Sequence, residues 1–272
     1  MKLLEISEVE FFPFYQREGA GSLEEKIKQV PLRGIARLDG EPVRVYQNAQ
    51  LKISTLTPED LRQRVFTGQP MVYQTHLDFL AQLEKMTLEK TGERITQLTQ
   101  CMNLTSRFVD EAGEEQTSRW TLIPPVVEEN TYPLDGMVEG KLRYDEFNIH
   151  LPADLRVNAE LGEYTFGSRR YKVVFPIICD GIHRIYLAYQ RNEPVTVAYL
   201  SGVLEGFPYY AHPKPFEQCT VVPSHDHEHD PEYAALHKVH VLEGEGAKRL
   251  YRLFPAAGLY TGGVRPDAVL KK

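Results

Sequence analysis

The segment from residue 171 to residue 200 constrains the fold more than any other part of the sequence. Apolar and β-branched residues at 171–178 predict a strand. Gly181 follows, and the apolar positions of 182–191 fit a short helix. Residues 194–200 are again rich in β-branched side chains and predict a second strand. This order has the size of a βαβ crossover, in which the two strands would pair in parallel.

The remainder of the chain predicts strands and further helices. Residues 57–60, Thr-Pro-Glu-Asp, form a helix start, with a hydroxyl cap, proline at the first position and acids near the positive end of the dipole. That helix should end near Gly68. A longer helix is expected from about residue 75 to residue 102, with Gly92 as a point where it would divide. About the first 55 residues predict short strands and turns. The expected fold class is therefore α+β.

Composition narrows the class of protein. A chain of 272 residues is long enough for one large domain or two small ones with a real core. No run approaches the ~20 apolar residues of a membrane span, and the N-terminus lacks the apolar stretch of a signal peptide, so a cytoplasmic location without membrane contact is expected. The net charge of -7 makes DNA a less favoured partner. Three widely spaced cysteines do not form a disulfide framework.

The turn Asp180-Gly181-Ile182-His183-Arg184 carries the strongest signal for a binding site. Gly181 permits a positive φ and close approach of the backbone to a ligand. The helix that follows presents free N–H groups, which attract anions. His183 and Arg184 add donors, and arginine can hold a phosphate through two hydrogen bonds. Asp180 could cap the helix, accept a proton or bind a metal ion. The local chemistry predicts a phosphate-binding or nucleotide-binding turn.

This arrangement resembles a known family. The strand, the Asp-Gly-x-His-Arg turn, the helix and the following Glu-Pro-Val-Thr-Val strand at 193–197 resemble the core signature of the ParB/sulfiredoxin-like superfamily. The resemblance covers about residues 120–205. It implies a mixed sheet with flanking helices at 119–205, preceded by an N-terminal α/β extension of unknown role at 1–118. A loop-rich and helical extension would follow at 206–272.

The resemblance also implies a ligand. In the superfamily this turn binds nucleotide phosphates, so Gly181, His183 and Arg184 are expected to hold ATP or CTP, together with Mg²⁺. Ile182 stands where the sulfiredoxins carry their catalytic cysteine, which argues against sulfiredoxin activity.

Three hypotheses for the function follow, and the sequence leaves turnover and oligomeric state open. In the first, the protein catalyses phosphoryl transfer or nucleotide hydrolysis, with Glu128 or Asp180 as base or magnesium ligand and with His183 and Arg184 stabilising developing charge. Glu128, or its neighbour Glu129, matches by order in the chain the acid that the free-serine kinases of the superfamily use. In the second hypothesis the protein is a nucleotide-gated module for a protein or DNA partner. A ParB-like nuclease is the third.

A histidine-rich run near the C-terminus is a weaker candidate. His225, His227 and His229 alternate with acids, and residues two apart share one face of an extended strand. Three imidazoles on one face could bind zinc, nickel or copper. Structural metal sites usually draw their ligands from more than one element, so a solvated loop is favoured and no metal site is assigned.

Overall fold

The computed structural model describes one part of the chain. The described residues are 2–12, 28, 44–68, 71–110, 113–135, 137–138, 141–142, 160–161, 170–204 and 214–223. This part is α+β, as the sequence predicts, and contains helices α2 (Pro58–Arg64), α3 (Gln74–Thr91) and α4 (Ile182–Gln190) and the 3-10 turn η1 (Phe216–Gln218). None of its helices is long and apolar enough to cross a membrane.

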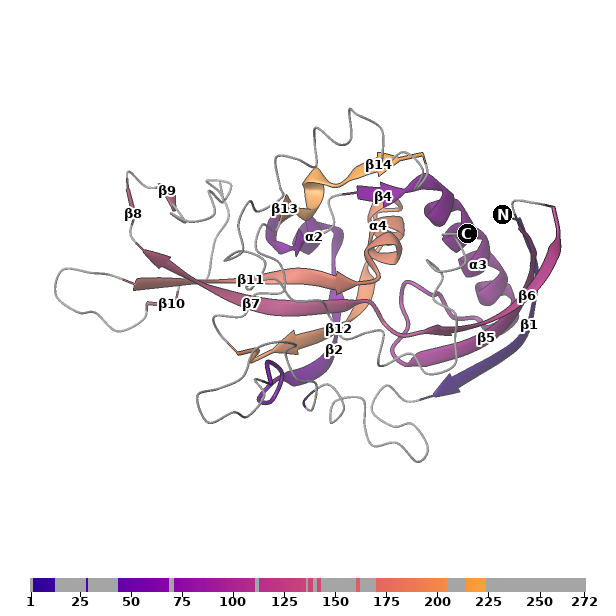
Figure 1. The fold of residues 1–272 in the computed structure, drawn as a ribbon, viewed down its shortest axis with the longest axis horizontal. Helices are drawn as coiled ribbons and strands as arrows, with labels where there is room; N and C mark the ends of the chain where they lie inside the picture. Colours follow the sequence, from indigo (N-terminus) through magenta and orange to yellow (C-terminus); the bar gives the residue numbers. More distant parts are fainter. Residues whose placement is uncertain are drawn as a thin grey trace.

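The strands of the described residues form one large mixed sheet and three smaller sheets (Figure 1). In order across the large sheet the strands are β13 (Lys214–Pro215), β3 (Phe66–Thr67), β11 (Arg170–Asp180), β7 (Val126–Asp135), β12 (Val195–Ser201) and β2 (Gln50–Leu56), and β10 (Glu160–Leu161) pairs with β11. The three-stranded sheet has the order β1 (Lys2–Phe12), β5 (Cys101–Val109), β6 (Glu115–Leu122). The two-stranded sheets are β4 (Met71–Tyr73) with β14 (Thr220–Val222), and β8 (Met137–Val138) with β9 (Lys141–Leu142).

The strand, helix and strand around the glycine turn form where the sequence predicts them, as β11, α4 and β12. The predicted parallel pairing of the two strands is wrong. β7 lies between them, antiparallel to β11 and parallel to β12, so β11 and β12 run in opposite directions. Periodicity within a segment reports its type and its buried face, but it does not report which distant strand becomes its neighbour.

Helix α2 begins as the sequence predicts. The Thr57 hydroxyl oxygen accepts a hydrogen bond from the Asp60 N–H at 3.1 Å, and the Asp60 carboxylate accepts one from the Thr57 N–H at 2.9 Å. This reciprocal pair is a capping box. The helix ends at Arg64, before the predicted Gly68, because the next residues pair with β11 as strand β3.

Helix α3 ends at Thr91 rather than near residue 102. Gly92 takes φ 77° and donates its N–H to the Leu88 carbonyl, which closes the helix with a left-handed C-cap. The predicted helical continuation is wrong, since Cys101 already begins β5. Gly92, which was expected to divide a longer helix, therefore marks the end of α3.

Strands from the N-terminal part of the chain belong to the large sheet. β2 pairs with β12 along its whole length, and β3 pairs with β11. The predicted domain boundary between residues 118 and 119 falls inside β6. Residues 45–48 form a turn.

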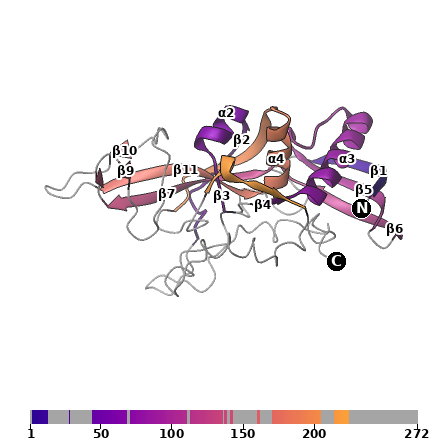
Figure 2. The same ribbon diagram turned by 90° about the horizontal axis from the view of Figure 1, so that it is seen from above.

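The large sheet has a different core on each face. Val195 and Val197 of β12 pack into the core that α2, α3 and α4 share with the three-stranded sheet. Ala198 and Leu200 pack into a second core, together with the turn that contains Tyr46. Adjacent residues of a strand point to opposite faces, so these two sets identify the two sides of the sheet. Figures 1 and 2 show β7 and β11 extending side by side away from the helices.

One buried hydroxyl of α3 gives a prediction about stability. Thr87 is completely buried, and no group in the described residues hydrogen-bonds its Oγ1. Thr87→Val should raise the free energy of unfolding by about 1 kcal/mol, because it removes a buried polar group that lacks a partner. Urea denaturation measures this. Thr91→Val is the matched control, since the Thr91 hydroxyl donates to the Thr87 carbonyl at 2.7 Å. Equal destabilisation by both changes would contradict the prediction.

Candidate functional site at the start of α4

Gly181 connects β11 to α4 in a conformation that only glycine fits well. It is the N-cap of the helix, with φ 77° and ψ 23°, in the left-handed region. A Cβ built on it would lie 2.8 Å from the Pro125 Cβ and 3.0 Å from the Pro125 Cα. The start of α4 therefore rests directly on the segment that links β6 to β7, and both the backbone conformation and the space require glycine.

Arg184 lies in the first turn of α4 and is 6% exposed. Its Nη1 donates to the backbone carbonyl of Ile123. Its Nη2 lies 3.0 Å from the position that a Gly181 Cβ would occupy. Within the described residues no carboxylate pairs with this guanidinium, although buried charges in proteins are generally paired. A buried cation with one neutral acceptor retains N–H groups that an anion can engage.

His183 connects the start of α4 to the start of α3. Its Nε2 accepts a hydrogen bond from the Tyr73 N–H at 3.0 Å. The His183 ring stacks on the Tyr73 ring with centroids 5.5 Å apart. The buried His76 ring lies 4.7 Å from that of His183. The three rings bring the N-termini of two helices together.

The charge at this junction is unusual for helix starts. Neither α3 nor α4 carries an acid in its first turn, where acids normally complement the positive end of the helix dipole. Asp180 precedes Gly181 at the end of β11 and is partly exposed. The structure thus places Asp180, Gly181, His183 and Arg184 at one site, in an environment suited to a negatively charged ligand.

Glu128 does not lie at the site formed by Asp180, Gly181, His183 and Arg184. It is fully buried, and its Oε2 accepts a 2.7 Å hydrogen bond from the Tyr46 hydroxyl and a 3.7 Å contact from the Cys179 thiol. Tyr46 belongs to the second core, whereas α4 packs into the first. Glu128 and the first turn of α4 are therefore on opposite faces of the large sheet.

The acid beside it faces the helices. Glu129 is half-buried and alternates with Glu128, so its side chain leaves the sheet on the side of the first core. Burial, and then the charge of Glu129, raises the pKa of Tyr199 above its ordinary value. On α4 itself, burial is the largest cause that raises the pKa of Tyr186, followed by the charges of Cys219 and Tyr189. Neither tyrosine would ionise near neutral pH.

The histidine run His225, His227 and His229 lies outside the described residues. Across the parts that the structure does describe, no group of three or more His, Cys, Asp and Glu side chains could hold a metal ion.

Comparison with known proteins gives one match. Residues 167–222 match the family model of the ParB CE domain. The predicted resemblance to the ParB/sulfiredoxin-like superfamily is confirmed. The matched segment contains β11, the glycine turn, α4, β12 and β14. No curated protein and no solved structure matches the chain.

Sequence reasoning missed the residues that surround the turn. Tyr73 and His76 precede and begin α3, and no motif marks them as partners of His183, which lies 110 positions away from Tyr73. Pro125 carries no binding motif of its own. The two adjacent prolines, Pro124 and Pro125, were the available signal that the backbone here is held rigidly.

Proposed function

We propose that the start of α4 binds the phosphates of a nucleotide, within a domain of the ParB/sulfiredoxin-like fold. The observation that carries the proposal is Arg184, a buried guanidinium without a carboxylate partner in the described residues, lying beside the left-handed Gly181. The match over residues 167–222 supports the same segment as the centre of the domain. ATP and CTP are the proposed ligands.

The residues present fit such a ligand. Arg184 offers charged N–H donors, and the first turn of α4 offers backbone N–H groups. Mg²⁺ is commonly held by one or two carboxylates together with phosphate oxygens, and Asp180 is the acid in place for it. The metal would neutralise phosphate charge that Asp180 would otherwise repel.

The position of Glu128 favours a binding module over phosphoryl transfer with Glu128 as base. A general base must reach the proton that it removes, directly or through one water. Glu128 contacts Tyr46 and Cys179 on the other face of the sheet. We therefore propose a nucleotide-gated module, in which the bound nucleotide stabilises a surface for a protein partner, with DNA as a less favoured one.

Calorimetric titration with ATP, CTP and GTP, with and without Mg²⁺, tests the proposal. Arg184→Ala should weaken binding by about tenfold or more, because a hydrogen bond to a charged group contributes about 1.5–3 kcal/mol. Arg184→Lys keeps the charge and should retain part of the affinity. Arg119→Ala, which removes an exposed arginine of β6, is the control and should bind normally. Absence of binding by all three nucleotides, or equal affinity of Arg184→Ala and the unaltered protein, would refute the proposal.

Phosphate release measured on the same samples separates binding from turnover. The proposed module should bind without releasing phosphate. Steady release that is lost in Asp180→Ala would instead favour an enzyme.

A further inference from the structure

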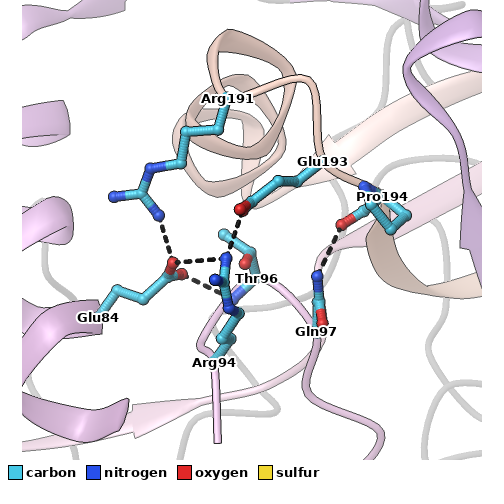
Figure 3. Close-up of polar contacts among 7 residues, drawn as sticks. All are labelled: Glu84, Arg94, Thr96, Gln97, Arg191, Glu193 and Pro194. Atoms are coloured by element: carbon cyan, nitrogen blue, oxygen red, sulfur yellow. Dashed lines mark hydrogen bonds and ion pairs between the residues drawn. The ribbon is translucent and has the colours of Figure 1, made fainter. Parts of the chain in front are cut away.

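Helix α4 is attached to its surroundings at both ends. At its start, His183 accepts the Tyr73 N–H. At its other end lie four charged side chains, Glu84, Arg94, Arg191 and Glu193, which we call the four-charge cluster (Figure 3). They come from α3, from the segment after Gly92 and from the turn between α4 and β12, as the close-up shows.

Glu84 is the centre of the four-charge cluster. It projects from α3 and is 3% exposed. Its carboxylate accepts a hydrogen bond from Arg191 Nη1, lies 4.0 Å from Arg94 Nη1 and accepts the Thr96 N–H at 3.3 Å. A buried carboxylate that loses its cationic partners is strongly unfavourable, so Glu84 restricts where Arg191 can lie.

The segment after Gly92 holds the turn that follows α4. Arg94 pairs with Glu193, and this hydrogen bond is the main cause that raises the pKa of Arg94. Close to this ion pair, the Thr196 N–H donates to the Thr96 carbonyl at 3.0 Å, and the Gln97 side chain donates to the Pro194 carbonyl at 3.4 Å. Side-chain and backbone contacts therefore fix the turn after α4 against the segment that follows Gly92.

We infer that the four-charge cluster is a positioning element that holds α4 in the place where Gly181 meets Pro125 and Arg184 reaches Ile123. A helix of nine residues is a rigid rod about 13 Å long, so displacement of its end also displaces its start. The start tolerates little displacement, because Gly181 is already packed against Pro125. The link from α4 to nucleotide affinity rests on the proposed function, whereas the positioning of α4 does not.

Hydrogen exchange of backbone amides tests the positioning without any nucleotide. Arg184 and Ile185 donate their N–H groups to the Gly181 carbonyl at 3.0 and 3.1 Å. Glu84→Gln should speed exchange of these two amides by about tenfold or more, while amides of β5 exchange as before, because local opening is independent of the rest of the fold. Glu59→Gln, which removes an exposed ion pair with Arg62 on α2, should change neither set.

Further variants separate positioning from general stability. The double variant Arg94→Gln with Glu193→Gln should speed exchange no more than the larger of the two single changes, because both changes remove the same ion pair. If Glu84→Gln does not fold, Glu193→Gln is the milder substitute, because the Glu193 side chain is 29% exposed. An equal rise of exchange in α4 and β5, or unchanged exchange at Arg184 and Ile185, would overturn the inference.

Nucleotide titration of the same variants tests the link to the site. If the unaltered protein binds nucleotide, Glu84→Gln should weaken binding about in proportion to the fraction of molecules in which α4 is displaced. Faster exchange with unchanged affinity would overturn the link while leaving nucleotide binding standing. If the unaltered protein binds no nucleotide, the proposed function fails, and the exchange result alone decides whether the cluster positions α4.

Discussion

Gly181→Ala should lower the free energy of unfolding by about 2–5 kcal/mol and should weaken nucleotide binding. A left-handed backbone costs a residue with a Cβ about 1–2 kcal/mol. The added Cβ would also lie 2.8 Å from the Pro125 Cβ, and such overpacking typically costs about 1–3 kcal/mol. Relief of the overlap would push the start of α4 away from Pro125 and move Arg184 from its place. Chemical denaturation and calorimetric titration measure the two effects.

Gly92→Ala is a closely matched control. Gly92 has the same φ of 77°, at the other end of a helix, and a Cβ built there would meet nothing within 4 Å. Its replacement carries the backbone cost without the overlap, so it should destabilise by about 1–2 kcal/mol and leave nucleotide affinity unchanged. The difference between the two variants isolates the close approach to Pro125. If Gly181→Ala cost no more than Gly92→Ala, the packing described for the start of α4 would be wrong.

Glu128→Ala should also lower the free energy of unfolding by about 2–4 kcal/mol, but with nucleotide affinity preserved. The change removes the acceptor of the 2.7 Å hydrogen bond from the buried Tyr46 hydroxyl and leaves a cavity in the second core. Affinity should persist because Glu128 and the first turn of α4 lie on opposite faces of the sheet. The same denaturation and titration experiments measure both quantities.

Glu128→Gln separates a structural role from a chemical one. The amide oxygen can still accept from Tyr46, so most of the stability should remain. If this variant kept its stability but lost nucleotide affinity, or lost a turnover that the unaltered protein shows, Glu128 would act at the nucleotide site. That result would contradict the placement of Glu128 on the face of the sheet opposite the first turn of α4.

Local features of this protein were predictable from the sequence because short-range interactions determine them. The capping box of Thr57 and Asp60 joins residues three positions apart, and the turn at Gly181 follows from its lack of a side chain. The apolar pattern of residues 182–191 marked α4 to within one residue of its end. The resemblance drawn from the glycine turn, confirmed by the match over residues 167–222, rests on the same compact segment.

The end of α3 shows where local signals become ambiguous. Gly92 was expected to divide the helix, but helical structure was still predicted to about residue 102. The last residues of that range, Cys101 and Met102, are instead buried in β5, between β1 and β6. Burial by a sheet and burial by a helix require the same kind of side chain, and a short apolar run does not distinguish them.

The sequence by itself determined an α+β chain with a glycine turn, a helix after it and donors suited to an anion. The tertiary structure alone decided that β7 separates β11 from β12, that Glu128 faces away from α4, and that Arg184 donates to the Ile123 carbonyl. The tertiary structure also decided the contact of His183 with Tyr73, 110 positions apart in the chain, and that of Arg191 with Glu84, 107 positions apart. Strand order and the packing of distant helices depend on how all the apolar faces are buried together, and no single segment contains that information.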